Sequence, residues 1–173
     1  TLRWKQPAAE IERFFRTQDG ALLAWARNEQ MLYSIADDKI QPLCQLPALF
    51  CTGTERLYPG ENTPYDCLVF ANDACFGWQI AEIAVTQLFV CDTVGLYDMD
   101  VDAFCGMGDG QYLGLEFYPS EDETVQYRLF WLTPAEGDFS KKSLLRIAGS
   151  RSGIFSMAVR DFSSLYPEYQ VEF

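Results

Sequence analysis

The sequence predicts an α+β fold, a single domain over residues 1–173 in which a mainly antiparallel sheet is accompanied by helices near both termini. The chain has 173 residues, of which 49% are hydrophobic, and this is enough to bury one core. Short apolar runs separated by Gly, Pro, Asn and Asp are typical of antiparallel strands. Segments near the two ends instead carry apolar residues at helical spacing.

The first expected helix covers residues 7–16, PAAEIERFFR. Pro7 suits the first helical turn, and the acids precede the bases along the segment, as the helix dipole favours. Ile11, Phe14 and Phe15 form one apolar stripe at helical spacing. The QDG motif that follows is expected to end this helix.

Four strands are expected in the next part of the chain, with a long loop rich in Pro and Gly before the last of them. They are ALLAWARN at 21–28, QMLYSIA at 30–36, the proline-interrupted IQPLCQL at 40–46 and YDCLVFAND at 65–73. The last of these has an unbroken apolar centre, which is typical of a strand buried on both faces.

The second half of the chain is less uniform in its pattern. Residues 75–92, CFGWQIAEIAVTQLFVCD, fit either two strands or one strand and a helix, because periodicity alone does not separate the two. QYLGLEFYP at 111–119 and VQYRLFWL at 125–132 predict a hairpin. A short helix is expected within residues 141–150, and an apolar stripe predicts a closing helix over residues 154–169.

The charge of the chain is unevenly distributed. The formal net charge is −12, and residues 57–127 contain thirteen acids but no Lys or Arg. Such a segment either keeps a hydrophobic protein in solution or forms a negative surface for a positive partner, and charge patterning alone leaves both open. It disfavours direct binding to nucleic acid, because phosphate contacts require cations.

The six cysteines predict a reduced, cytoplasmic protein without a zinc site. None forms a CxxC pair, the chain has no histidine, and several cysteines lie in apolar stretches where a thiol packs as a small hydrophobe. The N-terminal stretch has no apolar region of the kind found in signal peptides, and no apolar run is long enough to span a membrane.

The residues give little support for catalysis. Without histidine, Ser-His-Asp and Cys-His sets cannot be built from this chain. The glycine-rich phosphate-binding motifs GxxxxGK[ST] and GxGxxG are also missing. We therefore expect no enzyme and no cofactor, although two carboxylates at a suitable separation would suffice for a glycosidase.

Alternating aspartates precede a glycine-rich bend in YDMDVDAFCGMGDG, residues 97–110. Asp98, Asp100 and Asp102 match the first, third and fifth positions of a calcium loop. Ala103 then stands where the loop requires glycine, and Asp109 where it requires glutamate. The pattern therefore predicts no EF-hand site, which leaves an irregular calcium site, an exposed turn, or an edge that binds a protein. We expect the last of these.

The expected partner-binding surface combines these acids with a second acidic cluster in the turn before residue 125. Its residues are Asp98, Asp100, Asp102, Asp109, Glu121, Asp122 and Glu123. A basic protein is the expected partner, since complementary charge raises both the association rate and the specificity of binding.

Four stretches of the chain resemble segments of the SUKH superfamily, in the same order. IERFFRTQDGALLAW is similar to its helix, turn and strand, and CLVFANDACFGWQIA to its central strand and turn. GDGQYLGLEF resembles its hairpin entry, and IFSMAVRDFSSLY its closing helix. The resemblance implies a non-enzymatic α+β binding domain, and many such domains are bacterial immunity proteins that neutralise a toxin, often a nuclease. The alternatives are a carboxylate-based enzyme or metal-binding domain, and an acidic subunit of a larger assembly.

Overall fold

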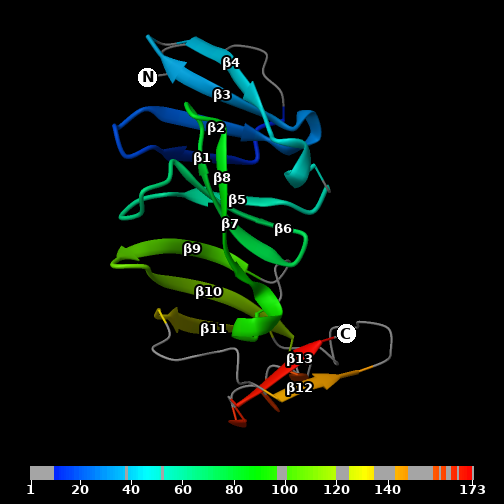
Figure 1. The fold of residues 1–173 in the computed structure, drawn as a ribbon. Helices are drawn as coiled ribbons and strands as arrows, with labels where there is room; N and C mark the ends of the chain where they lie inside the picture. Colours follow the sequence, from blue (N-terminus) through cyan, green and yellow to red (C-terminus); the bar gives the residue numbers. More distant parts are fainter. Residues whose placement is uncertain are drawn as a thin grey trace.

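The fold consists of three antiparallel sheets and one parallel strand pair (Figure 1). The computed structural model describes residues 10–37, 39–51, 53–96, 101–119, 125–134, 143–147, 158–159, 161–162, 165–166 and 168–172. Each antiparallel sheet is a meander, because its strands are neighbours in the same order as in the sequence.

Sheet A is the N-terminal meander. Its strands are β1 (Arg13–Arg16), β2 (Leu22–Ala26), β3 (Met31–Ala36) and β4 (Lys39–Gln45). The short 3-10 segment η1 (Arg27–Glu29) connects β2 to β3, and η2 (Ala48–Phe50) follows β4. Pro42 lies in β4, an edge strand of this sheet, where a missing backbone N–H is tolerated.

Sheet B follows with β5 (Arg56–Pro59), β6 (Cys67–Ala71), β7 (Ala74–Gln79) and β8 (Ala84–Val90). Residues 75–92 thus form two strands, which decides between the two structures that the sequence allowed. The 3-10 segment η3 (Cys91–Val94) ends this meander.

Sheet C contains β9 (Val101–Gly108), β10 (Gln111–Pro119) and β11 (Val125–Leu132). β10 and β11 pair antiparallel from Tyr112 opposite Leu132 to Pro119 opposite Val125, so the predicted hairpin is confirmed. β12 (Ser143–Arg146) and β13 (Tyr169–Glu172) form the separate parallel pair.

Sheet B is the middle layer of the molecule. Alternate residues of β6 point to opposite sides, so Cys67, Val69 and Ala71 pack in one core with Trp25 and other sheet A residues. Leu68 and Phe70, in the other register, pack in a second core with residues of sheet C. All five residues of β6 are buried, which confirms the prediction from its unbroken apolar sequence.

The first strands of the three meanders lie next to one another. β1 contacts β5, and β5 contacts β9. Figure 1 shows this succession, in which β5 is drawn between β1 and β9. Side chains that leave one first strand can therefore reach the backbone of the next.

The prediction of an α+β fold is wrong, since strands make up almost all of the defined elements in the described residues. The defined helical elements are three 3-10 segments of three or four residues. The helix expected at 7–16 is replaced over its second half by β1, which pairs with β2 from Arg13 opposite Trp25 to Arg16 opposite Leu22. Phe15 is buried while Phe14 is 59% exposed, so the burial has the period of a strand.

One further expectation fails in the second half of the chain. Residues 141–150, where a short helix was expected, contain strand β12. The glycine-rich bend expected in residues 97–110 is present as the turn at Asp109 and Gly110, which follows strand β9. Within the closing segment, residues 158–159, 161–162 and 165 are helical, and the chain then enters β13. Strand β5 was not expected, because its four residues end in Pro59 within a loop-like composition.

Candidate functional site

Two of the seven acids predicted to bind a partner lie in the described residues. Asp102 and Asp109 are both exposed, the first near the start of β9 and the second in the turn that follows it. The other five lie outside the described residues: Asp98, Asp100, Glu121, Asp122 and Glu123.

Asp102 is exposed because β9 is irregular at this point. Ala103 pairs with Leu115 and Val101 with Glu116, so Asp102 is the extra residue of a bulge. Bulges redirect a side chain out of the regular alternation of a strand. The sequence predicted that Asp102 binds a partner, but it did not predict that Asp102 lies in a strand.

Asp109 has a local structural role in addition to its charge. It forms a two-residue hairpin turn with Gly110, and their φ angles are 51° and 72°. Tight hairpin turns of this kind favour Asp-Gly, because both residues must adopt positive φ. The turn therefore accounts in part for the presence of an aspartate at position 109.

Asp102 and Asp109 cannot bind the same ion. They lie at opposite ends of β9, seven residues apart, which at the rise of a strand is about 23 Å. Calcium ligands lie within about 2.6 Å of the ion. Within the described ranges, no group of three or more acids, cysteines or histidines is placed to hold a metal ion.

A cleft of about 800 Å³ lies beside Asp109. Three segments line it: the turn after β1, the loop between β5 and β6, and the β9–β10 turn. The lining residues are Arg16, Thr17, Gln18, Glu61, Asn62, Thr63, Pro64, Asp109, Gly110, Gln111 and Tyr112. Tertiary folding thus brings together residues that are far apart in the sequence.

The loop from Gly60 to Asp66 is held in place by its own hydrogen bonds and by its neighbours. Thr63 donates its hydroxyl to the Gly60 carbonyl at 2.6 Å, and Gln18 donates to the same carbonyl at 3.3 Å. Asn62 donates its side-chain amide to the carbonyl of Gly106 on β9 at 3.1 Å. The loop is therefore tied to both other walls of the cleft.

Gly106 allows this loop to approach β9. A Cβ atom at this position would lie 2.3 Å from Cγ2 of Thr63 and 2.6 Å from the carbonyl oxygen of Glu61. These distances are far below the optimal separation of about 3.5–4.0 Å between carbon atoms. Gly106, the first glycine of the GMGDG stretch, therefore makes room for a wall of the cleft.

The cleft contains one cation and two carboxylates. Arg16, Glu61 and Asp109 are all exposed, and none of the three forms an ion pair or side-chain hydrogen bond with another described residue. Sequence reasoning missed Arg16, which lies outside the acidic segment, and did not select Glu61. The Pro-Gly-Glu-Asn stretch before Thr63 is a turn signal that could have suggested a fixed loop.

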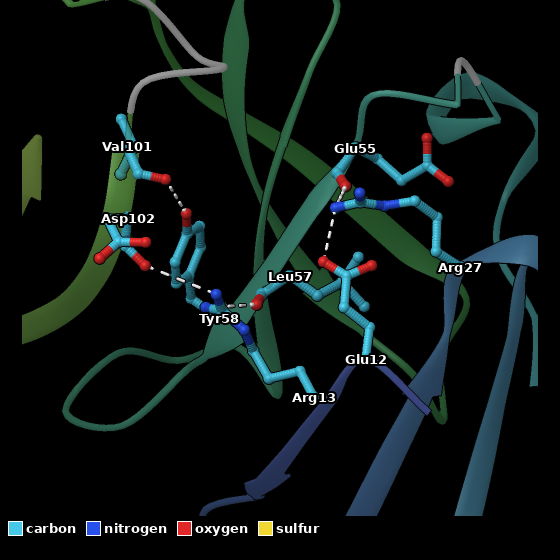
Figure 2. Close-up of polar contacts among 8 residues, drawn as sticks. All are labelled: Glu12, Arg13, Arg27, Glu55, Leu57, Tyr58, Val101 and Asp102. Atoms are coloured by element: carbon cyan, nitrogen blue, oxygen red, sulfur yellow. Dashed lines mark hydrogen bonds and ion pairs between the residues drawn. The ribbon is translucent and has the colours of Figure 1, made fainter. Parts of the chain in front are cut away.

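A second cluster of polar contacts connects the first strands of the three sheets (Figure 2). Arg13 on β1 donates to the Leu57 carbonyl on β5 at 3.3 Å and to the Asp102 carbonyl on β9 at 3.5 Å. Its guanidinium lies 4.6 Å from the ring centre of Tyr58. Tyr58 in turn donates its hydroxyl to the Val101 carbonyl at 2.5 Å.

Arg27 forms the other half of this junction. It donates to a carboxylate oxygen of Glu12 at 2.7 Å and to the carbonyl of Glu55 at 3.0 Å. Figure 2 shows both arginines reaching from sheet A toward the strand that carries Leu57 and Tyr58. We call this group of contacts the junction. It has a structural role, because Arg13 and Arg27 donate their hydrogen bonds to backbone carbonyls of neighbouring segments.

Burial changes the acid–base properties of several groups near these sites. It raises the pKa of Tyr58 to about 12, against the opposing effect of the positive charges of Arg13 and Arg56. It also raises the pKa values of the Cys67 and Cys75 thiols. None of the six cysteines, all within the described residues, is in a disulfide. Buried thiols of raised pKa are poor nucleophiles.

The chain matches no protein-family model, no curated protein and no solved structure. Among the described residues, no helix is long and apolar enough to cross a membrane. The resemblance to the SUKH superfamily stays a prediction. A function for this chain must therefore be argued from the chemistry of its own surfaces.

Proposed function

We propose that this chain is a non-catalytic binding protein that recognises a basic protein partner, acting in the cytoplasm as an immunity protein that neutralises a toxin. One observation carries the proposal: Glu61 and Asp109 line the same cleft, and neither carboxylate is paired within the described structure. Exposed carboxylates of this kind are available to a lysine or arginine of a partner.

The charge of the surrounding surface supports the same partner. Residues 57–127 contain no Lys or Arg, so a cation of this chain can reach their acids only from another segment. Arg13 is such a cation, but it donates to carbonyls and leaves the Asp102 carboxylate exposed. An anionic surface of this kind increases the association rate with a basic protein, and salt weakens the effect.

Some acids of this segment already have structural roles and are not part of the proposed contact. Asp66 accepts a hydrogen bond from the backbone N–H of Ile80 at 2.8 Å. Glu116 is fully buried and accepts from Arg128 at 2.7 and 2.9 Å. Among the other described acids, we place in the contact Glu61 and Asp109, which line the cleft, and Asp102, which is exposed on β9.

The fixed loop of the cleft makes the binding site partly preorganised. Hydrogen bonds from Gln18, Asn62 and Thr63 hold the segment that presents Glu61. A partner would then lose less conformational entropy on binding than with a mobile loop. Preorganisation and charge complementarity are the two properties that a tight protein inhibitor requires.

A glycoside hydrolase is the second candidate, because two carboxylates, Glu61 and Asp109, line the same cleft. Such enzymes require two carboxyl groups on either side of the scissile bond, about 5–9.5 Å apart. Incubation with chromogenic glycosides tests this candidate, since hydrolysis that disappears in both Glu61→Gln and Asp109→Asn would establish it and contradict the binding function.

Co-expression tests the proposed function most directly. The product of the neighbouring gene is expressed in cells with and without this chain, and growth is recorded. We expect growth to stop without the chain and to be restored with it. If the neighbouring product is harmless, or if it stays toxic when both are expressed, the immunity proposal fails.

Matched variants then test the surface. Glu61→Gln with Asp109→Asn removes the two charges of the cleft, while Glu82→Gln removes an exposed charge in the β7–β8 turn, outside it. In stopped-flow measurements, we expect the double variant to raise the dissociation rate of the complex by about tenfold or more, as for a lost contact of 1.4 kcal/mol or above. Glu82→Gln should change the association rate slightly and leave dissociation unaltered.

Equal effects of the double variant and of Glu82→Gln would show that the acids act through general charge alone. The cleft would then not be the contact site.

A further inference from the structure

The cleft beside Asp109 contains a cation that the binding of a basic partner does not explain. Arg16 lines this cleft together with Glu61 and Asp109, and all three side chains are exposed. Among the residues that the structure describes, Arg16 forms an ion pair with neither carboxylate. A cation in a site for cations repels the ligand, so Arg16 requires a role of its own.

A partner that covers the cleft also removes water from the guanidinium of Arg16. A charge that is buried without a counter-charge strongly disfavours binding. The backbone does not bring Glu61 or Asp109 closer to supply one, because each segment is fixed. Arg16 pairs with Leu22 in sheet A, Asp109 lies in a tight turn, and the loop of Glu61 is tied to β9 through Asn62. A carboxylate of the partner is therefore the favoured counter-charge.

The cleft has room for more than one side chain of a partner. Its volume is about 800 Å³, and clefts of roughly 300–1,000 Å³ accommodate whole small-molecule ligands. Three side-chain amides, those of Gln18, Asn62 and Gln111, are part of its lining. Amides both donate and accept hydrogen bonds, which suits the backbone of a peptide segment.

Tyr112 is an independent indication of a polar ligand. It lies opposite Gly106 across β9 and β10, so its side chain leaves the sheet on the same face as the loop at residues 61–63, which packs over Gly106. Tyr112 lines the cleft and is only 8% exposed, and its hydroxyl forms no hydrogen bond with another described residue. A buried tyrosine hydroxyl usually has a partner, which a polar ligand in the cleft can supply.

We propose that the cleft binds an arginine of the partner together with an adjacent carboxylate on the same segment. Glu61 and Asp109 bind the guanidinium, whose five donors can serve two carboxylates at once. Arg16 binds the neighbouring carboxylate. The inference rests on the proposed function, since it specifies which group of the basic partner enters the cleft.

Blocked tetrapeptides test the inference with the purified chain alone. Acetyl-Gly-Arg-Asp-Gly-amide and acetyl-Gly-Asp-Arg-Gly-amide carry the proposed pair of groups in both orders and have no net charge. Their counterparts with asparagine in place of aspartate are cationic. Titration at constant ionic strength, up to on the order of 20 mM peptide, detects binding in the millimolar range. The backbone NMR signals of Asn62, Gly110 and Gln111 report on the cleft.

We expect at least one aspartate peptide to bind about two- to fivefold more tightly than its asparagine counterpart, as for one additional exposed ion pair. General attraction to the chain predicts the opposite order, because a net charge of −12 favours the cationic peptides. The order of affinities therefore separates recognition by the cleft from the effect of net charge.

Arg16→Gln should remove this preference, and Lys39→Gln provides the matched control. Lys39 is an exposed cation in β4 outside the cleft, so its replacement should leave the preference unchanged. An Arg16→Gln chain that binds both kinds of peptide more tightly would contradict the inference, because Arg16 would then only repel cations.

Asparagine peptides that bind the wild-type chain as tightly as the aspartate peptides would overturn the inference and still leave a basic partner in place. The inference is also wrong if none of the peptides binds, or if the NMR signals change only outside the cleft. The co-expression experiment does not depend on these peptides, so the failure of this inference and the failure of the proposed function are distinguishable.

Discussion

Arg13 is the side chain that connects all three sheets, and its removal should destabilise the protein measurably. The change Arg13→Met keeps the length and the apolar stem of the side chain and removes its hydrogen-bond donors. It eliminates the bonds to the carbonyls of Leu57 and Asp102 and the contact with the ring of Tyr58.

The magnitude follows from the geometry of these contacts. The two hydrogen bonds are long, at 3.3 and 3.5 Å, so each is expected to contribute about 0.5–1 kcal/mol, the low end of the usual range. A partly exposed cation over an aromatic ring adds about 0.5–1 kcal/mol. We therefore expect the free energy of unfolding to fall by about 1.5–3 kcal/mol.

Urea unfolding followed by tryptophan fluorescence measures this difference, and Arg16→Met provides the matched control. Arg16 is on the same strand but exposed, without an ion pair to another described residue, so its replacement should change stability by less than about 0.5 kcal/mol. Equal effects of the two variants, or a loss below about 0.5 kcal/mol for Arg13→Met, would show that the junction does not hold the sheets together.

Three other changes have defined outcomes. Gly106→Ala should lower stability by about 1–3 kcal/mol in urea unfolding and shift the NMR signals of the cleft loop, because the new Cβ would lie 2.3 Å from Thr63 Cγ2; unchanged spectra would contradict the packing. Burial raises the pKa of Tyr58 from 10.0 to about 12, so the protonated side chain is favoured in the folded state. The contribution of Tyr58 to the free energy of unfolding is therefore complete below pH 10, and it falls by about 1.4 kcal/mol per pH unit between pH 10 and pH 12. Tyr58→Phe should lack this part of the decline, and an identical pH dependence would refute it. In thiol titration, exposed Cys51 should react first and Cys67 only after unfolding, when six thiols in total are found; two or fewer would indicate disulfides.

Removal of divalent cations provides one more test. Asp102 and Asp109 are about 23 Å apart along β9, too far to share an ion. We therefore expect a chelator to leave the melting temperature unchanged. A decrease of several degrees that calcium reverses would show a metal site that involves other residues.

The strands of the middle layer could be predicted from the sequence because their pattern is local. An unbroken apolar run such as that of β6 requires cover on both faces, whatever the rest of the fold. The hairpin of β10 and β11 was equally clear, since alternating apolar residues on both sides of a polar turn favour antiparallel pairing.

The first strand could not be predicted in the same way. Ile11, Phe14 and Phe15 fit the period of a helix, whereas burial at Phe15 and Thr17 fits that of a strand. Residues 13–16 form a strand because they pair with β2, whose residues lie up to twelve positions away in the sequence. Over so few residues, tertiary pairing outweighs the weak local preference for a helix.

The sequence alone determined that this chain has no histidine for the common catalytic sets and that one long segment carries acids without cations. It did not determine which of these acids are available to a partner. Tertiary structure buried Glu116 against Arg128, placed Asp102 in a bulge, and brought Arg16 from sheet A into the cleft with Glu61 and Asp109. The reason is physical: composition sets the total charge, but the exposure and pairing of each carboxylate depend on contacts between segments that are distant in sequence.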